Sequence, residues 1–222
     1  MDSILVKLFI KDYKNTQSED VRIKYGALAS IFGIVSNVII CAFKIVIGVI
    51  SGALSILADG INNLSDALNS IVSLLGFKMS QKKPDKEHPY GHQRMEYIAG
   101  FIVSVIVCVL GVQLILEAID KIRNPGSEVS YFYLNLGILC FAIIIKLYQA
   151  ILYRSIGKKI NSQTLIATST DSRNDVISTS LVLVGLIISK FTGYNLDGYF
   201  GLAVGLLVCY SGIKLVMEAS NP

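Results

Sequence analysis

Long apolar runs alternate with short polar segments along most of the chain. Four of these runs carry no charged side chain: residues 25–43, 97–116, 129–145 and 198–213. Two other stretches, residues 55–79 and 162–189, carry charge in their first halves and are apolar in their second halves. A membrane-spanning helix needs about 20 mostly apolar residues. The pattern therefore predicts six transmembrane helices and an all-α membrane protein.

Positive charge is distributed unevenly between the connections of these helices. The segment before the first helix, the second-to-third connection and the fourth-to-fifth connection together hold 13 lysines and arginines. The connections on the opposite side hold Lys121, Arg123 and Lys190. Because lysine and arginine collect in the cytoplasmic loops of membrane proteins, both termini are expected in the cytoplasm.

Composition agrees with a membrane location. Hydrophobic residues make up 53% of the 222 residues and charged residues 16%, against about 25% charged residues in a soluble domain. The expected organisation is a cytoplasmic segment (1–24), a six-helix transmembrane domain (25–217) and the start of a linker (218–222). We expect a multi-pass protein of the bacterial plasma membrane, whose basic segments set its topology and contact lipid rather than nucleic acid.

Two of the helices carry polar pairs at membrane depth. In the segment ADGINNLSDALNS, Asn62 and Asp66 are four residues apart, and Asp171 and Asp175 have the same spacing in the fifth helix. Residues four apart lie on one face of a helix, one turn from each other. A carboxylate in the membrane costs at least ~2.5 kcal/mol, so it is expected to serve a function. Packed face to face, the two helices would present three carboxylates and one amide carbonyl to a divalent cation.

The donor atoms indicate which cation would bind. All four side chains offer oxygen, which suits Mg²⁺, Ca²⁺ and Mn²⁺, whereas imidazole and thiolate suit Zn²⁺ and copper. The four cysteines lie singly in apolar runs and form neither a disulfide framework nor a CxxC site. Three close carboxylates do not all ionise cheaply, so metal binding would release protons. The sequence thus predicts metal–proton exchange, with the metal as cargo and no resident cofactor.

Neighbouring polar residues also have simpler interpretations. Asparagine and serine often form hydrogen bonds between membrane helices, and this role alone could explain four residues of the segment. They are Asn62, Asn63, Asn69 and Ser70. Asp59 lies on nearly the same face as Asn62 and Asp66. It is a ligand, a residue that supports the ligands, or a residue near the outer interface, and the last two are favoured. Lys146 is expected to extend its ammonium toward the inner interface.

The cytoplasmic loop KPDKEHPYGHQRMEY holds both histidines of the chain. His88 and His92 are four residues apart, but Pro89 and Gly91 argue against a continuous helix between them. Together with Asp85, the two histidines have the chemistry of a zinc-type site. The alternative is that both are solvated side chains of a basic loop.

Three stretches, taken together, resemble the cation diffusion facilitator family. They are GALSILADGINNLSDALNS, HPYGHQRMEYIAGF and LYRSIGKKINSQTLIATSTDSRNDVISTS. The resemblance runs from about Arg22 to Pro222. It implies a homodimeric divalent-metal/proton antiporter with its transport site between the second and fifth helices. Members of this family usually continue into a cytoplasmic ferredoxin-like domain. The sequence stops at LVMEASNP, where that domain would begin, so we expect the chain to lack it.

The resemblance also assigns roles to individual residues. The positions that match the family's transport ligands are Asn62, Asp66, Asp171 and Asp175, without the imidazole that is typical of zinc members. An asparagine at the position of Asn62 resembles the pattern of the manganese-exporting members. The loop residues Asp85, His88 and His92 match a second metal site found in some members.

The sequence therefore favours a secondary transporter, not an enzyme, that exports Mn²⁺ from the cytoplasm in exchange for protons. A transporter of Zn²⁺, Fe²⁺ or Co²⁺ is the first alternative. An intramembrane aspartyl protease is a distant one, since membrane aspartates can act as acid and base. Against the protease, the GxGD motif of such enzymes is missing and Asp197 lies in NLDGYFG instead.

Overall fold

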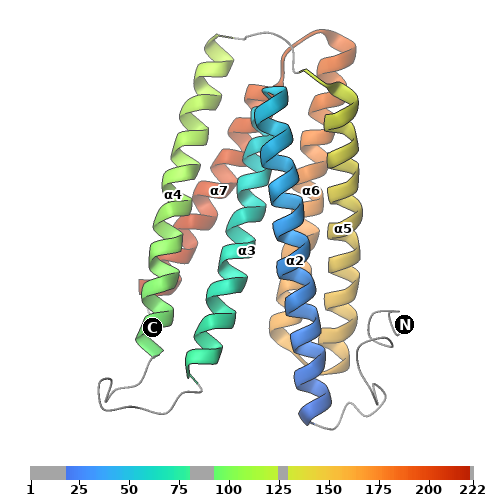
Figure 1. Ribbon diagram of the computed structural model, residues 1–222. Helices are drawn as coiled ribbons and strands as arrows, with labels where there is room; N and C mark the ends of the chain where they lie inside the picture. Colours follow the sequence, from blue (N-terminus) through green and yellow to red (C-terminus); the bar gives the residue numbers. More distant parts are fainter. Residues whose placement is uncertain (1–18, 81–92, 125–129, 221–222) are drawn as a thin grey trace.

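The computed structural model describes residues 19–80, 93–124 and 130–220, and nearly all of these residues are helical (Figure 1). Six helices follow one another: α2 (Glu19–Ser51), α3 (Leu54–Ser80), α4 (Gln93–Arg123), α5 (Phe132–Lys159), α6 (Gln163–Thr192) and α7 (Asp197–Ser220). The all-α class and the six predicted helices are confirmed. The first helix is longer than the uncharged run that predicted it, because it continues through Lys44 to Ser51.

Consecutive helices run in opposite directions through the bundle. In Figure 1, α2 begins at the lower end and α7 finishes at the lower end, so the described chain starts and ends on the same side. The distribution of basic residues assigns this side to the cytoplasm. The turns that join α2 to α3 and α6 to α7 then belong to the outer side.

The six helices form two groups that meet at α3. The most extensive contacts join α4 to α7, α5 to α6 and α2 to α3, while α3 also contacts α4, α6 and α7. Figure 1 shows α4 and α7 on one side of α3, and α2, α5 and α6 on its other side. The helix with the ADGINNLSDALNS segment is therefore central to the bundle.

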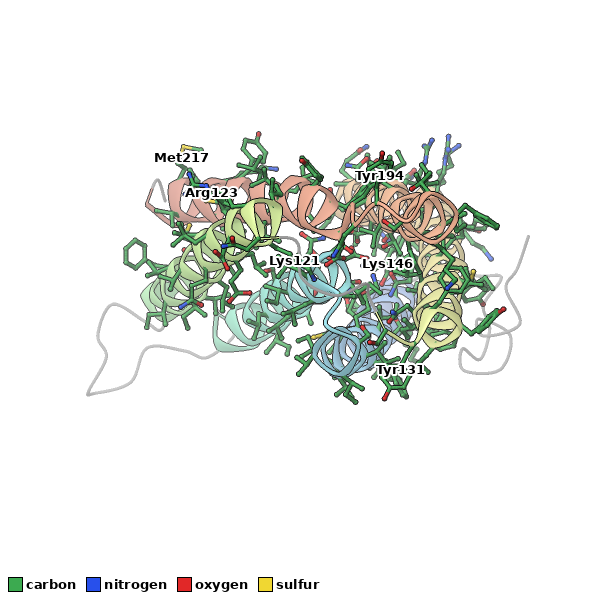
Figure 2. The ribbon with its side chains drawn as sticks, turned by 90° about the horizontal axis from the view of Figure 1, so that it is seen from above. Lys121, Arg123, Tyr131, Lys146, Tyr194 and Met217 are labelled. Atoms are coloured by element: carbon green, nitrogen blue, oxygen red, sulfur yellow. The ribbon has the colours of Figure 1, made fainter. Side chains whose placement is uncertain are left out.

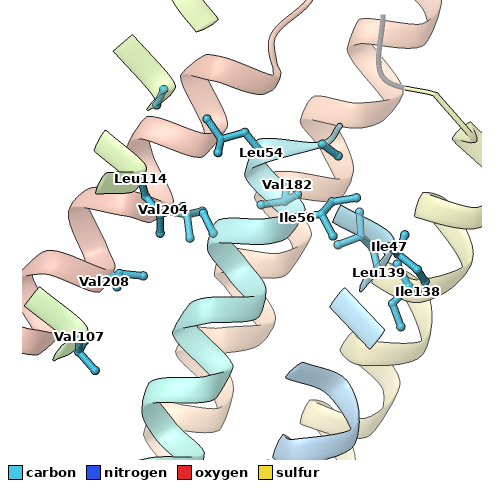
Figure 3. Close-up of a cluster of buried hydrophobic side chains, with 13 residues drawn as sticks. Ile47, Leu54, Ile56, Val107, Leu114, Ile138, Leu139, Val182, Val204 and Val208 are labelled. Carbon is cyan, nitrogen blue, oxygen red and sulfur yellow. The ribbon is translucent and has the colours of Figure 1, made fainter. Parts of the chain in front are cut away.

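One cluster of thirteen buried hydrophobic side chains draws on all six helices (Figure 3). Some of its members come from α3 and from the helices on the α2 side of it. Among them are Ile47 of α2, Ile56 of α3, Leu139 of α5 and Val182 of α6. In every one of these helices, the cluster residue lies on the outer side of the polar residues described below. Apolar packing therefore separates those polar residues from the outer end of the bundle.

Glycines allow two pairs of helices to approach closely. A Cβ atom at Gly48 would lie 2.8 Å from the backbone nitrogen of Leu57, across the contact of α2 with α3. A Cβ atom at Gly111 would lie 2.8 Å from the Cα atom of Cys209, across the contact of α4 with α7. Small residues at such contacts are common in membrane bundles, where close packing replaces the hydrophobic effect between helices.

Five of the helices are long and apolar enough to cross a membrane: α2, α4, α5, α6 and α7. Their outward faces carry large exposed hydrophobic side chains, among them Val35, Phe43 and Ile50 on α2. The remaining helix, α3, has 27 residues but carries aspartates and asparagines along its first half. It contacts α2, α4, α6 and α7, and its Asp59 and Asn63 side chains are buried, as expected for a helix that keeps polar groups away from lipid.

At the outer end, Asp197 joins three helices. Its Oδ2 atom accepts the backbone N–H of Leu54 at 2.7 Å, and its Oδ1 atom accepts that of Ser55 at 3.1 Å. The Lys121 ammonium of α4 lies 2.7 Å from Oδ2. The carboxylate at the start of α7 therefore caps the N-terminus of α3, whose first N–H groups have no partner within the helix.

Candidate cation-binding site

Two hydrogen bonds fix the register of α3 against α6. Thr179 Oγ1 donates to Asp59 Oδ2 at 2.8 Å, and Asn62 Nδ2 donates to Asp175 Oδ1 at 3.1 Å. Because the two helices are antiparallel, each step inward along α3 meets an earlier position of α6. The next level inward therefore has position 66 of α3 opposite position 171 of α6.

The inner polar layer consists of Asn62, Asp66, Asp175 and a lysine from a third helix. The Lys146 ammonium of α5 donates to Asp175 Oδ2 at 2.5 Å and to Asp66 Oδ2 at 3.4 Å. The Lys146 side chain is 2% exposed, that of Asp175 12% and that of Asp66 36%. Seen from above in Figure 2, Lys146 lies within the bundle. Lys146 is thus buried, while Asn62 and Asp66 are partly accessible.

The structure brings together three of the four residues predicted as transport ligands, namely Asn62, Asp66 and Asp175. Asp171 lies one turn further toward the cytoplasmic end of α6, and its side chain is exposed. In the described ranges, no group of three or more His, Cys, Asp or Glu side chains is gathered closely enough to hold a metal ion. Coordination of one cation by all four side chains stays a prediction.

The outer polar layer lies one turn away and is closed. The Lys44 ammonium of α2 donates to Asp59 Oδ2 at 2.6 Å and to Thr179 Oγ1 at 3.1 Å. Both side chains of this ion pair are fully buried. Asp59 therefore does not lie at the outer interface, which was one of the two favoured interpretations. It binds an ammonium group instead, and this pair connects α2, α3 and α6.

Lys146 does not extend to the inner interface, so that prediction is wrong, and Lys44 is a second buried lysine that was not predicted. An ammonium that reaches the interface keeps its hydration, whereas Lys146 is buried and has two carboxylates as partners. The signal that could have found both lysines is the cost of a charge at membrane depth. A basic residue there needs an acidic partner, and the predicted helices offered few other than Asp59, Asp66 and Asp175.

The other polar residues of α3 bond mostly within their own helix. Asn63 Nδ2 donates to the backbone oxygen of Asp59 at 2.6 Å, and Ser70 Oγ donates to that of Asp66 at 2.8 Å. Asn62 differs, because its amide reaches across to Asp175 on α6. Hydrogen bonding between helices, one of the interpretations considered for this stretch, thus applies to Asn62, whereas the bonds described for Asn63 and Ser70 stay within α3.

The two layers differ in their balance of charge. The outer layer pairs one carboxylate with one ammonium, Asp59 with Lys44. The inner layer sets the carboxylates of Asp66 and Asp175 against the single ammonium of Lys146. A cation with more charge than one ammonium is therefore favoured in the inner layer, and oxygen atoms are the ligands that it would find there. The inner layer is the candidate cation-binding site.

The loop site with Asp85, His88 and His92 lies outside the described residues. The prediction of the loop site therefore has no structural counterpart here. Of the predicted segments 1–24 and 218–222, residues 1–18 and 221–222 also lie outside them, whereas residues 19–24 begin α2 and residues 218–220 end α7.

A six-helix membrane bundle with a buried, acid-rich layer between two of its helices defines a multi-pass membrane protein of the cation-transporter class. Comparison with known families gives the same class, since the cation efflux transmembrane domain matches residues 30–221. The chain belongs to the cation efflux family, and it is a transporter rather than an enzyme.

Several curated relatives carry more specific names. The chain is 34% identical to an uncharacterized transporter of Methanocaldococcus jannaschii over 80% of its own length and 62% of that protein. It is 29% identical to the manganese efflux system protein MneS of Bacillus subtilis, over 90% of its length and 68% of MneS. It is 31% identical to MneP, a manganese efflux system protein of the same organism, over 87% of its length and 65% of MneP. The chain thus spans about two thirds of the length of these relatives.

Proposed function

We propose that this protein exports Mn²⁺ from the cytoplasm in exchange for protons, through a site formed by Asn62, Asp66, Asp171 and Asp175 between α3 and α6. The observation that carries the proposal is the meeting of Asn62 and Asp66 with Asp175 in a buried layer that has more carboxylates than ammonium groups. The relatives named as manganese efflux proteins support the choice of metal.

The geometry supports loading from the cytoplasmic side. The Asp66 side chain is more exposed than that of Asp175, whereas the Lys44–Asp59 pair on the outer side is fully buried. Beyond that pair lies the apolar cluster around Ile56 and Val182. A cation that enters from the cytoplasm meets the exposed Asp171 and then Asp66, and release to the outside requires the outer layers to open in an alternating-access movement.

Protons compete with the metal because both bind the same carboxylates. The site binds Mn²⁺ with its carboxylates ionised, so Mn²⁺ affinity is expected to fall as the pH is lowered. Protons that enter from the outer side would displace the metal and return the carboxylates to their neutral form. This competition is the physical basis proposed for antiport.

Transport by purified protein in liposomes tests the proposal. With a pH gradient across the membrane, Mn²⁺ flux is measured for the original chain and for Asp66→Ala and Asp175→Ala. Each substitution is expected to lower the initial rate at least about tenfold, since a loss of ~1.4 kcal/mol in binding already has this effect. Asp120→Ala, at an exposed acid that bonds to Asn124 on α4, is the matched control. Unchanged flux in both site variants would refute the proposal.

The choice of Mn²⁺ over Zn²⁺ depends on Asn62. Oxygen ligands suit Mn²⁺, but affinity for a given site generally rises from Mn²⁺ toward Zn²⁺, so geometry and ligand type must provide selectivity. Replacing Asn62 by histidine introduces an imidazole and is expected to shift a metal competition titration toward Zn²⁺. If Asn62→His leaves the Mn²⁺/Zn²⁺ preference unchanged, the ligand argument for manganese fails and the Zn²⁺, Fe²⁺ or Co²⁺ alternative gains.

Two further expectations complete the proposal. The homodimer implied by the family resemblance is tested by the mass of the protein–detergent complex in light scattering. A second metal at Asp85, His88 and His92 is tested by metal stoichiometry, because a double substitution of the histidines should remove one bound ion and leave Mn²⁺ flux in place.

A further inference from the structure

The ammonium of Lys146 occupies the region between the two carboxylates of the proposed transport site. It lies 2.5 Å from Asp175 Oδ2 and 3.4 Å from Asp66 Oδ2, and its side chain is 2% exposed. Carboxylate oxygens hold small divalent cations at about 2.0–2.6 Å. An ion that bridges Asp66 and Asp175 therefore needs nearly the same volume as the ammonium, and the two cations exclude each other.

We propose that Lys146 is a specificity-determining residue: its tethered ammonium competes for Asp66 and Asp175, so that a divalent cation displaces it and a monovalent cation does not. This inference rests on the proposed function, because it takes the same carboxylates as the transport site. The ammonium keeps its positive charge throughout, and the selection depends on charge and position alone.

The discrimination follows from electrostatics. At equal distance, a divalent cation interacts with a carboxylate twice as strongly as an ammonium does. Na⁺ or K⁺ has the same charge as the ammonium and gains no such advantage. The lysine is also held next to the carboxylates by its own backbone, which gives it a high effective concentration that a free monovalent ion has to match.

The bundle offers the displaced ammonium another acceptor. Gln149 lies three residues further along α5, on the same face as Lys146 and toward the cytoplasmic end. Its Nε2 atom donates to Ser36 Oγ and Asn37 Oδ1 on α2. Its Oε1 atom is buried and accepts no hydrogen bond from the described residues. If the ammonium moved one turn toward the cytoplasmic end, it would donate a hydrogen bond to Gln149 Oε1. This bond is favourable because a buried acceptor without a hydrogen bond is costly.

Equilibrium binding of MnCl₂ to the full chain in detergent tests the proposal at several NaCl concentrations. N-methylglucamine chloride keeps the ionic strength constant. In the original chain, the Mn²⁺ dissociation constant should stay constant as Na⁺ rises. In Lys146→Met, it should fall at least about tenfold at low Na⁺ and then rise with Na⁺, as expected for direct competition. In transport, the same variant should lower both KM and the maximal rate, because a site that binds more tightly releases more slowly.

Two further variants separate competition from damage. Lys146→Arg keeps the charge and adds a fork that binds carboxylates in a bidentate manner, so it should exclude Na⁺ and weaken Mn²⁺ binding. The double variant Lys44→Met/Asp59→Asn removes the other buried ion pair without changing net charge. It should bind Mn²⁺ without sensitivity to Na⁺, because the ammonium that it loses is that of Lys44, which does not lie between Asp66 and Asp175, and Lys146 is kept.

Several results would overturn the proposal. A folded Lys146→Met that binds Mn²⁺ no more tightly and ignores Na⁺ would do so, as would a Lys146→Arg that binds Mn²⁺ more tightly than the original chain. Failure of both variants to fold would also count against it, because the ammonium would then be a fixed part of the bundle. Asp66→Asn and Asp175→Asn are measured in parallel. If neither weakens Mn²⁺ binding, the proposed transport site itself is wrong, which is a separate outcome.

Discussion

Away from the proposed transport site, removal of the Asp197 carboxylate is the change with the clearest structural consequence. It accepts two backbone N–H groups at the start of α3, pairs with Lys121 of α4, and belongs to α7. Asp197→Ala would remove the acceptor and leave those N–H groups in a buried position, since the residue is 7% exposed. We expect this variant to unfold more easily than the original chain.

The magnitude follows from the separate interactions. Loss of an N-terminal cap costs about 1 kcal/mol and reaches about 2 in favourable cases. Leaving a buried donor without a partner adds about 1–3 kcal/mol. The Lys121 side chain is 21% exposed, so its ion pair adds no more than about 1 kcal/mol. These contributions overlap, and we expect a total loss of about 3 kcal/mol in the free energy of unfolding.

Reversible unfolding in mixed micelles of a mild detergent and dodecyl sulfate, followed by circular dichroism, measures this loss. Asp120→Ala serves as the control, because Asp120 is an exposed acid near the same end of the bundle and bonds to Asn124. Its effect should stay within about 0.5 kcal/mol. If Asp197→Ala costs less than about 1 kcal/mol, the carboxylate does not cap α3 in the way described.

Two further predictions concern packing and buried charge. Lys44→Met leaves Asp59 charged, buried and unpaired, and should cost about 3–5 kcal/mol, whereas the double variant Lys44→Met/Asp59→Asn should recover at least about 2 of these in the same unfolding assay. Equal stability of the single and double variants would contradict the ion pair. Gly48→Ala should destabilise by about 1–3 kcal/mol, because its Cβ would lie 2.8 Å from the backbone nitrogen of Leu57. Gly137→Ala, where a Cβ would meet nothing within 4 Å, should be neutral or slightly stabilising, and equal effects of the two substitutions would refute the close approach.

Much of the fold could be predicted from the sequence because lipid leaves few alternatives. A segment such as 97–116 has no water with which its backbone can bond, so it has to be helical, and its length fixes the span. The i,i+4 spacing of Asn62 and Asp66 also survives into the structure, since it depends only on helix geometry. Helix boundaries were less predictable, and α2 continues through Lys44 because that charge finds a partner inside the bundle.

The partners of the buried charges could not be predicted from the sequence. That Lys146 meets Asp175 depends on the packing of α5 against α6, and no local pattern encodes the rotation of one helix against another. The sequence indicated that carboxylates at membrane depth need compensation, and it proposed a metal. The structure adds a protein cation that provides part of this compensation.

This addition changes how the proposed transport residues are distinguished from their neighbours. Asp59 and Asp66 are both aspartates of α3 at membrane depth, and residue type alone does not separate them. Their partners do: among the described residues, the Lys44 ammonium pairs with no carboxylate other than Asp59, while Asp66 and Asp175 share the ammonium of Lys146. A matched ion pair gains little from a further cation, whereas two carboxylates around one ammonium retain a net negative charge in a buried place, where unbalanced charge is most costly. A divalent cation is therefore favoured over the ammonium at Asp66 and Asp175 and not at Asp59, which is why we expect the inner layer to load a cation while the outer layer stays closed.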